Sequence, residues 1–309
     1  MTCWKEIELS DRKRINDLIC ASGCHGADYS FANLYIWRHA YDPRICFHGS
    51  RLLVAMPHYN LYAYPKGDGD IKPSIDFLLN EAHSNNHKLE IRGLTSKTLE
   101  EFLPLYGDKF EITEDRDNSD YIYTADKLCN LPGRHLSSKR NHINKFQRNG
   151  SWEFLPVAAA SCASRSSLNL PEGSVTSLAE AQAFVNEFYK EKDDPELKSE
   201  SLAIKEMFEN YEALGFFGGL LYQNGKPVAF TAGTRLDDHV FDIHFEKALP
   251  GVEGAYTMVN REFARSVVAT MPEITHFNRE EDMGIPGLRK AKESYHPDIL
   301  LWKFFAKEK

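Results

Sequence analysis

The sequence predicts an α/β fold in which helices cover mixed β-sheets. Apolar residues switch repeatedly between strand spacing and helix spacing, and turn residues separate the two kinds of segment. Hydrophobic residues make up 42% of the 309 residues, which is enough for a full core. A chain of this length favours two domains, because single cores stop growing at roughly 250–300 residues.

The first half of the chain contains three predicted helices and six predicted strands. Segment 12–20 has Ile15, Leu18 and Ile19 on one helical face, and segment 73–85 shows the same kind of spacing. The other expected elements of this half are strands at 45–48, 51–56, 60–64, 88–94, 110–113 and 120–123, and a helix at 96–103.

A basic segment follows at 134–148, and it has no acidic residue although the whole chain carries a net charge of -8. Leu136, Ile143 and Phe146 form a narrow apolar stripe on a helix, and the Asn-Gly pair after this segment is a helix stop. The stripe fixes one side, so we expect the cations to face an anionic ligand; the alternative is a solvated helix face. These cations are Arg134, Lys139, Arg140, Lys145 and Arg148.

The second half repeats the order strand, helix, strand, helix, strand with which the first half ends. This order predicts a duplicated α/β domain, with domains at 1–130 and 131–309. Asn224-Gly225 predicts a tight hairpin turn. The expected elements are strands at 152–157, 216–222, 227–234, 239–246, 273–278 and 299–306, helices at 178–190, 202–214, 256–269 and 287–294, and a loop at 158–177.

Strand 239–246 carries the first candidate catalytic residues. Side chains alternate between the two faces of a strand, so Asp242, His244 and Glu246 are expected on one face. Ionisable groups on a covered face are costly, which predicts that this face meets a cleft. Glu246 or His244 would serve as general base; the alternative is an exposed edge strand.

The turn after this strand contains Gly251 and Gly254 and leads through Ala255 into a helix. Backbone N–H groups at such a turn bind phosphate, aided by the helix dipole. Gly251, Gly254 and Ala255 are therefore candidate cofactor-binding residues for a nucleotide or coenzyme A, although Glu253 would repel an anion and a plain loop is an equal alternative.

Segment 278–297 combines acids, bases and a phenol after a predicted strand, at the edge where α/β sheets place ligands. Glu280 and Tyr295 are candidate catalytic residues, the latter as an acid. The alternative is a helix with ordinary surface ion pairs. The candidate substrate-binding residues here are Asn278, Arg279, Glu281, Arg289 and Lys292.

The cysteines and the lengths of the apolar runs limit which classes of protein the sequence can belong to. No apolar run reaches the roughly 18–20 residues of a membrane span, and the N-terminus lacks a signal-peptide core. We therefore expect a cytoplasmic protein with no metal site. Its scattered cysteines are expected to be reduced thiols; they are Cys3, Cys20, Cys24, Cys46, Cys129 and Cys162.

Segments 119–123, 139–146 followed by 152–157, and 278–297 resemble the lysylphosphatidylglycerol synthase C-terminal-domain family. That family is similar in fold to the Fem-type peptidyltransferases and belongs to the N-acyltransferase (GNAT-like) superfamily. The resemblance spans nearly the whole chain. It implies two tandem GNAT-like (acyl-CoA N-acyltransferase) domains, each a mixed sheet flanked by helices.

The resemblance also implies a soluble acyl- or aminoacyl-transferase that uses aminoacyl-tRNA as donor. The acceptor would be an amine or hydroxyl of a small molecule, a peptide or a lipid headgroup. The superfamily's coenzyme A loop is not reproduced at 249–255, so acyl-CoA is the second choice of donor. An acetyl-CoA-dependent N-acetyltransferase and a non-catalytic ligand-binding protein are the alternatives. By resemblance, the basic helix with Lys139, Arg140 and Lys145 would contact the tRNA or another phosphate-bearing ligand. Asn141 on the same helix is a further candidate substrate-binding residue.

Overall fold

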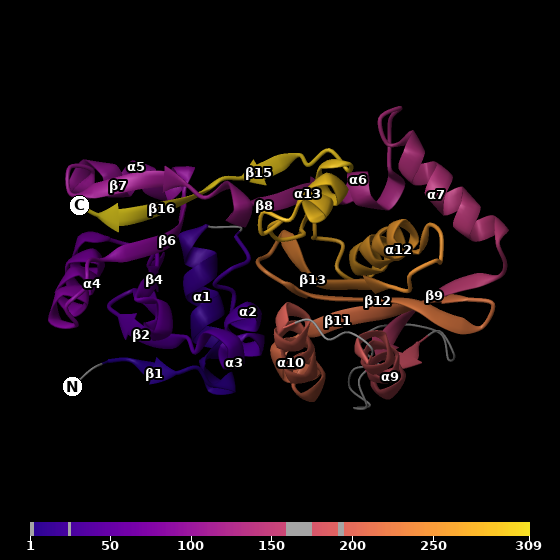
Figure 1. Ribbon diagram of the computed structural model, residues 1–309, viewed down its shortest axis with the longest axis horizontal. Coiled ribbons are helices and arrows are strands. Elements are labelled where there is room, and N and C mark those ends of the chain that lie inside the picture. The colour runs from indigo at the N-terminus through magenta and orange to yellow at the C-terminus, as the bar shows by residue number, and fades with distance from the viewer. Residues whose placement is uncertain (1–2, 24–25, 159–174, 191–194) are drawn as a thin grey trace. The chain divides into compact units, whose positions relative to one another are not determined.

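The computed structural model describes residues 3–23, 26–158, 175–190 and 195–309. Contacts within the chain divide it into two compact units, and each is built on a mixed β-sheet with helices beside it (Figure 1). Unit 1 comprises Met1–Tyr121, Glu280–Lys290 and Ile299–Lys309, and unit 2 comprises Ile122–Arg279 and Ala291–Asp298.

The sheet of unit 1 has the strand order β1-β2-β3-β4-β6-β16-β7, with β5 beside β3. Strand β4 pairs with β6 in parallel, and the other described pairs in this unit are antiparallel. The bounds are β1 (Lys5–Glu6), β2 (Arg44–His48), β3 (Arg51–Met56), β4 (Leu61–Ala63), β5 (Lys66–Gly67), β6 (Glu90–Thr95), β7 (Phe110–Glu114) and β16 (Lys303–Glu308).

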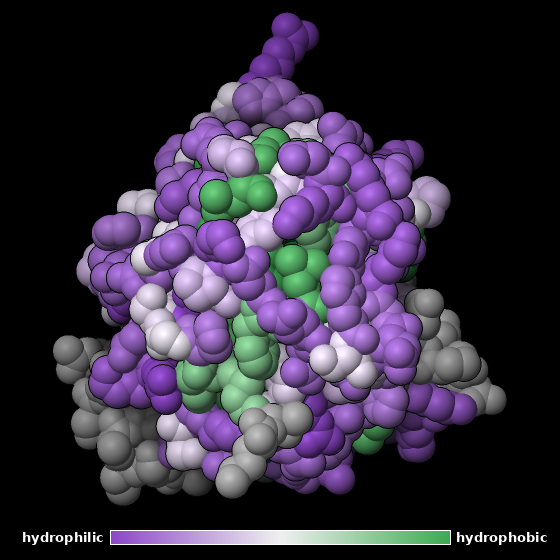
Figure 2. Space-filling model, turned by 90° about the vertical axis from the view of Figure 1, so that its left-hand side faces the viewer, coloured by the Kyte–Doolittle hydropathy of each residue, from purple (hydrophilic) through white to green (hydrophobic). Residues whose placement is uncertain are grey.

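Two helices of unit 1 build its main core against the sheet. Leu78 of α4, Phe102 of α5 and Ile91 of β6 are fully buried in one apolar cluster. Some apolar side chains remain on the surface, and Figure 2 shows them as an interrupted green band on a mainly hydrophilic face. The helices are α1 (Arg12–Ser22), α2 (Phe31–Ile36), α3 (Arg38–Tyr41), α4 (Lys72–Ser84) and α5 (Ser96–Tyr106), with short 3-10 turns at Leu9–Asp11, Pro57–Tyr59 and Arg116–Asn118.

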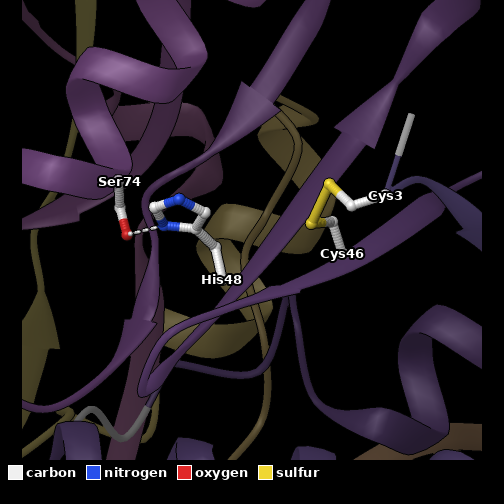
Figure 3. Close-up of a disulfide and its surroundings, with 4 residues drawn as sticks. All are labelled: Cys3, Cys46, His48 and Ser74. Carbon is white, nitrogen blue, oxygen red and sulfur yellow. Dashed lines mark hydrogen bonds between the residues drawn. A yellow bond between two sulfur atoms is a disulfide. The ribbon is translucent and has the colours of Figure 1, made fainter. Parts of the chain in front are cut away.

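A disulfide joins Cys3 to Cys46, and Figure 3 shows it beside His48 and Ser74. The expectation that the cysteines are all reduced is therefore wrong for this pair. Strand β1 pairs antiparallel with β2, and this pairing brings together two cysteines that are 43 residues apart in sequence. Cys129 is buried, and burial raises the pKa of its thiol to about 11. Cys24 and Cys162 lie outside the described residues.

The sheet of unit 2 has the strand order β10-β9-β11-β12-β13-β14-β8. Helix α12 covers one face, where the Phe263 ring packs against Phe217 and Phe241, and α9 and α10 lie on the other (Figure 1). Helix α11 contacts β11, where Tyr211 packs on Phe216. The strands are β8 (Asp120–Thr124, which enters from unit 1), β9 (Trp152–Ala158), β10 (Thr176–Ser177), β11 (Phe216–Gln223), β12 (Lys226–Arg235), β13 (Val240–Ala248) and β14 (His276–Asn278). The helices are α6 (Ala125–Asn130), α7 (Ser137–Arg148), α9 (Leu178–Tyr189), α10 (Pro195–Glu209), α11 (Tyr211–Leu214) and α12 (Ala255–Thr270).

The remaining segments show where the predicted elements differ from the structure. The predicted strand 299–306 is two strands, β15 (Ile299–Leu301) and β16, and the predicted helix 202–214 is divided between α10 and α11. Most of the predicted loop 158–177 lies outside the described residues. Helix α13 (Pro286–Glu293) begins in unit 1 and ends in unit 2. The predicted domains 1–130 and 131–309 stay a prediction, and the contact boundary itself falls inside β8.

Within the described part of the chain, no helix combines the length and the apolar composition that crossing a membrane requires. The expected α/β fold class, with mixed sheets flanked by helices, is confirmed.

Candidate functional site

Strand β13 contains a β-bulge that separates two candidate catalytic residues. Phe245 pairs with Ala232 of β12, but the next residue of β12, Gly233, pairs with Ile243, so His244 is an extra residue in the ladder. An extra residue shifts the alternation of every side chain that follows it. The expectation that Asp242, His244 and Glu246 share one face is therefore wrong for Glu246.

His244 lies on the face opposite to α12. The centroid of its ring lies 5.2 Å from the centroid of the Phe216 ring. The Phe216 ring also packs against Tyr211 of α11. The Thr234 hydroxyl lies 2.8 Å from His244 Nε2, and the Asp242 carboxylate lies 3.6 Å from Nδ1. These contacts fix the orientation of a fully buried imidazole.

Glu246 lies on the α12 face and is held by two neighbours. Asn260 Nδ2 of α12 donates a hydrogen bond of 2.9 Å to Glu246 Oε1. Arg279, the first residue after β14, donates to Glu246 Oε2 from Nε at 3.1 Å and from Nη2 at 2.6 Å. Burial alone would lower the pKa of Arg279, but the Glu246 carboxylate outweighs this effect and raises it. The result is a tightly bound ion pair that is largely shielded from solvent.

Two cations lie against the ring of Tyr295. The guanidinium carbon of Arg279 is 4.9 Å from the ring centroid, and Nζ of Lys139 is 4.0 Å from it. Burial, followed by the charge of Arg279, lowers the pKa of Lys139 to about 8. Burial also raises the pKa of the Tyr295 phenol. We call Lys139, Glu246, Arg279 and Tyr295 the Tyr295 cluster.

The cluster brings together four of the predicted site residues from distant parts of the sequence. Lys292 supports it by donating from Nζ to the carbonyl oxygen of Arg279 at 2.5 Å, and Asn278 is buried in β14 beside it. Sequence reasoning missed Asn260. The sequence does contain a clue to Asn260: this polar residue lies next to Val259 and three residues before Phe263, and both of these belong to the buried side of α12.

Three basic side chains of helix α7 contact other residues of the protein. Lys139 lies on Tyr295, and Arg140 Nη1 donates to the carbonyl oxygens of Leu131 and Gly133. Lys145 forms an ion pair of 2.7 Å with Glu253. Lys139 and Arg140 are only partly exposed, whereas Lys145 is exposed beside its ion-pair partner, and the role of all three in substrate binding stays a prediction. Asn141 is exposed on the same helix.

The glycine turn before α12 is shaped by helix packing. Gly251 and Gly254 both have a φ of +83°, which favours glycine. A Cβ atom on Gly254 would lie 2.3 Å from the carbonyl oxygen of His142 in α7, whereas one on Gly251 would meet nothing within 4 Å. The Ala255 N–H donates to Val252 at 3.2 Å. Packing therefore explains Gly254, and cofactor binding at this turn stays a prediction.

Three other predicted site residues belong to unit 1, whereas the Tyr295 cluster lies in unit 2. Glu280 accepts a hydrogen bond from Asn33, and Arg289 bridges Asp282 and Asp117. The third is Glu281, and burial raises its pKa to about 8, an effect to which neighbouring carboxylates add.

Glu281 lies with Asp28 and Asp120 in a group whose carboxylate oxygens are within 4.8 Å of one another. Lys303 Nζ already lies in this group, at 2.6 Å from Asp28 and 2.5 Å from Asp120. The lysine ammonium therefore supplies the positive charge that a cation would bring.

Comparison with known proteins identifies the fold and the family. The model of the family "Phosphatidylglycerol lysyltransferase, C-terminal" matches residues 22–307. A conserved protein of unknown function from Bacteroides thetaiotaomicron VPI-5482 is 33% identical, with all of both chains covered and a TM-score of 0.86. A comparison with curated proteins finds no match.

Two more distant solved structures share the fold. L-PGS from Bacillus licheniformis is 17% identical, with 99% of this chain and 94% of that chain covered and a TM-score of 0.63. A tandem GNAT protein from the clavulanic acid biosynthesis pathway is 9% identical, with 99% and 98% covered and a TM-score of 0.50. The predicted tandem GNAT-like fold is thus confirmed. Because the family model covers most of the sequence, the chain belongs to the phosphatidylglycerol lysyltransferase C-terminal-domain family.

Proposed function

We propose that the chain is an acyl- or aminoacyl-transferase whose reaction centre is the Tyr295 cluster of unit 2. The family and the GNAT-like fold support acyl transfer as the type of reaction. The observation that carries the proposal is one carboxylate, Glu246, bound to Arg279, with a second cation, Lys139, on the same aromatic ring. This arrangement combines a proton acceptor with an excess of positive charge.

Acyl transfer needs both of these features. The attacking amine or hydroxyl must lose a proton, and the carbonyl oxygen of the donor gains negative charge in the transition state. Glu246 takes the proton, and Arg279 and Lys139 stabilise the oxyanion. Tyr295 keeps its proton near neutral pH because burial raises its pKa, and it donates that proton to the leaving group. His244 lies on the other face of the sheet, so Glu246 is the proposed base.

Aminoacyl-tRNA is the proposed donor. By resemblance, the pyrophosphate of an acyl-CoA would approach the turn before α12, where the backbone of α7 lies against Gly254. The Glu253 carboxylate in the same turn disfavours a second anion, although Lys145 neutralises part of its charge. The exposed cations Arg134 and Arg148 are available to tRNA phosphates, so binding weakens steeply as salt is raised.

A transfer assay with labelled donors tests the proposal. Wild type is incubated with an aminoacyl-tRNA or with acetyl-CoA, together with a panel of amines, peptides and hydroxyl acceptors. Arg279→Gln should lower the rate of aminoacyl transfer by about 100-fold or more, because it removes one oxyanion-stabilising donor. The matched control is Lys205→Gln, which removes an exposed cation paired with Glu209 on α10 and should leave the rate unchanged.

The two donors used in the assay distinguish the proposed function from its alternatives. Transfer from acetyl-CoA alone would establish the N-acetyltransferase alternative. Binding of charged tRNA without transfer to any acceptor would establish the non-catalytic alternative. Thermal unfolding of each variant confirms that a lost rate does not reflect a lost fold.

A further inference from the structure

Buried polar atoms without a hydrogen-bond partner gather around the Glu246 carboxylate. Within the described residues, Asn260 Oδ1 and Arg279 Nη1 are shielded from solvent and have no such partner. The Thr231 hydroxyl is also buried and unpartnered, and its residue pairs with Glu246 across strands β12 and β13. Buried polar groups of folded proteins are usually hydrogen-bonded, so three unpartnered ones beside one carboxylate indicate a site that a ligand completes.

Two of these atoms have fixed hydrogen-bonding roles. Glu246 Oε1 accepts a hydrogen bond of 2.9 Å, so the Asn260 amide turns its NH2 group toward it and keeps its oxygen as a free acceptor. Arg279 uses Nε and Nη2 on Glu246 Oε2, so Nη1 remains as a free donor. A ligand that completes the site therefore brings an N–H group for Asn260 and an oxygen acceptor for Arg279.

The carboxylate that these two side chains hold keeps an opening to solvent. Glu246 and Arg279 each have 13% of the side chain exposed, whereas Asn260 is only 1% exposed. An acceptor that enters along Glu246 meets the carboxylate first. Oδ1 and Nδ2 of Asn260 share one amide carbon, and Nδ2 contacts Glu246 directly, so one nitrogen atom of the acceptor can contact both Glu246 and Oδ1.

We propose that the acceptor bound in the Tyr295 cluster is a primary amine and that the product is a secondary amide. A neutral primary amine has two N–H groups, so one proton passes to Glu246 while the other N–H donates to Asn260 Oδ1. A hydroxyl or a secondary amine has a single proton and leaves Oδ1 unpartnered, which weakens binding at a buried site. The inference rests on the proposed function and names its acceptor.

The step balances without a redox reaction. The lone pair of the amine attacks the carbonyl carbon of the acyl ester, a carbon–nitrogen bond forms, and the carbonyl oxygen accepts from Arg279 Nη1. One amine proton passes to Glu246. The bond between that carbon and the ester oxygen breaks, and this oxygen leaves with the electron pair and takes a proton from Tyr295. Glu246 then loses a proton to solvent, and Tyr295 gains one.

Binding of matched product analogues tests this inference without any transfer. N-butylacetamide offers an N–H group to Asn260, whereas N-butyl-N-methylacetamide and butyl acetate offer none. In NMR titrations of the full chain, N-butylacetamide should bind about tenfold more tightly than either analogue. Asn260→Ala should remove this preference, and the exposed Asn144→Ala on α7 should keep it. Equal binding of the three compounds by wild type, or no binding of N-butylacetamide, would overturn the proposal even if Asn260→Ala does not fold.

The transfer assay gives a separate result. Wild type should acylate butylamine about tenfold faster than N-methylbutylamine, and Asn260→Ala should acylate the two amines at similar rates. The loss of the bond from Asn260 to Glu246 affects both amines, so it cancels in this ratio. Transfer to butanol with none to butylamine would overturn the inference and leave the proposed function standing. If no acceptor is acylated, the proposed function fails, and the binding preference alone decides whether the site takes an amide.

Discussion

His244 and Glu246 are two residues apart on strand β13, yet their side chains lie on opposite faces of the sheet of unit 2. Regular alternation would place both on the face of His244. The bulge at His244 turns Glu246 toward α12, where Asn260 and Arg279 hold its carboxylate. One inserted residue thus decides which of the two can belong to the Tyr295 cluster.

Glu246→Gln and His244→Gln form a matched pair that tests this assignment. The amide of Glu246→Gln cannot take a proton, so the transfer rate should fall by about 100-fold or more. His244→Gln should keep the transfer rate within a few-fold and lose about 1 kcal/mol of stability with the Thr234 contact. Transfer rates and urea unfolding measure the two effects. A folded His244→Gln protein that loses transfer as strongly as Glu246→Gln would make His244 the base instead.

Gly254→Ala and Gly251→Ala separate backbone strain from helix packing. Both glycines have a φ of +83°, so each alanine should cost about 1–2 kcal/mol of conformational strain. At Gly254 the new Cβ would also lie 2.3 Å from the His142 carbonyl oxygen, so α7 must move. We expect Gly254→Ala to be less stable than Gly251→Ala by a further 1–3 kcal/mol in chemical denaturation. Equal losses would show that the α7 contact is readily displaced.

Elements with a clear apolar period were predictable from the sequence. The helix expected at 73–85 is α4 at Lys72–Ser84, because Ile75, Leu78 and Ala82 recur at helical spacing and are fully buried. Helix α2 was missed because all six residues of Phe31–Ile36 are buried, so it has no polar face to reveal a period. The bulge in β13 was missed because apolar and polar residues alternate from Phe241 to Glu246 as they would in a regular strand.

The candidate site was predictable only in part, for a reason that lies in the course of the chain. Segment 278–297 was expected to act as one group, but the chain passes from unit 2 to unit 1 between Arg279 and Glu280 and returns after Lys290. Arg279 and Tyr295 therefore join Lys139 in unit 2, whereas Glu280 belongs to unit 1. Nothing in the local sequence marks such a crossing, because only long-range packing defines it.

Glu281→Gln should change the pH dependence of stability. In the folded chain burial raises the pKa of Glu281 to about 8, so the side chain keeps its proton well above its usual value of 4.5. The folded state therefore binds more protons than the unfolded state between pH 4.5 and 8, and stability falls as pH rises through this window. The slope is at most about 1.4 kcal/mol per pH unit for one proton.

The Glu281→Gln variant should show a flatter profile of free energy of unfolding from pH 5 to 8 and should exceed wild type at pH 8. The exposed Glu100→Gln on α5 is the control and should keep the slope of the wild type. Asp28 contributes in the same direction, since burial raises its pKa as well, so some slope should remain. An unchanged slope in Glu281→Gln would show that Glu281 is ionised in the folded state.

Reduction of the Cys3–Cys46 disulfide should destabilise unit 1. The bond closes a loop of 43 residues and anchors β1, which is only two residues long, to the edge of the sheet. Cys3→Ser should therefore lower the free energy of unfolding by about 2–4 kcal/mol, chiefly because the unfolded chain gains freedom. Cys46→Ser should cause a similar loss, and the double variant should lose no more than the larger of the two. A reductant should lower the unfolding temperature of wild type and leave that of the double variant unchanged; an equal response of both would show that the bond does not stabilise the fold.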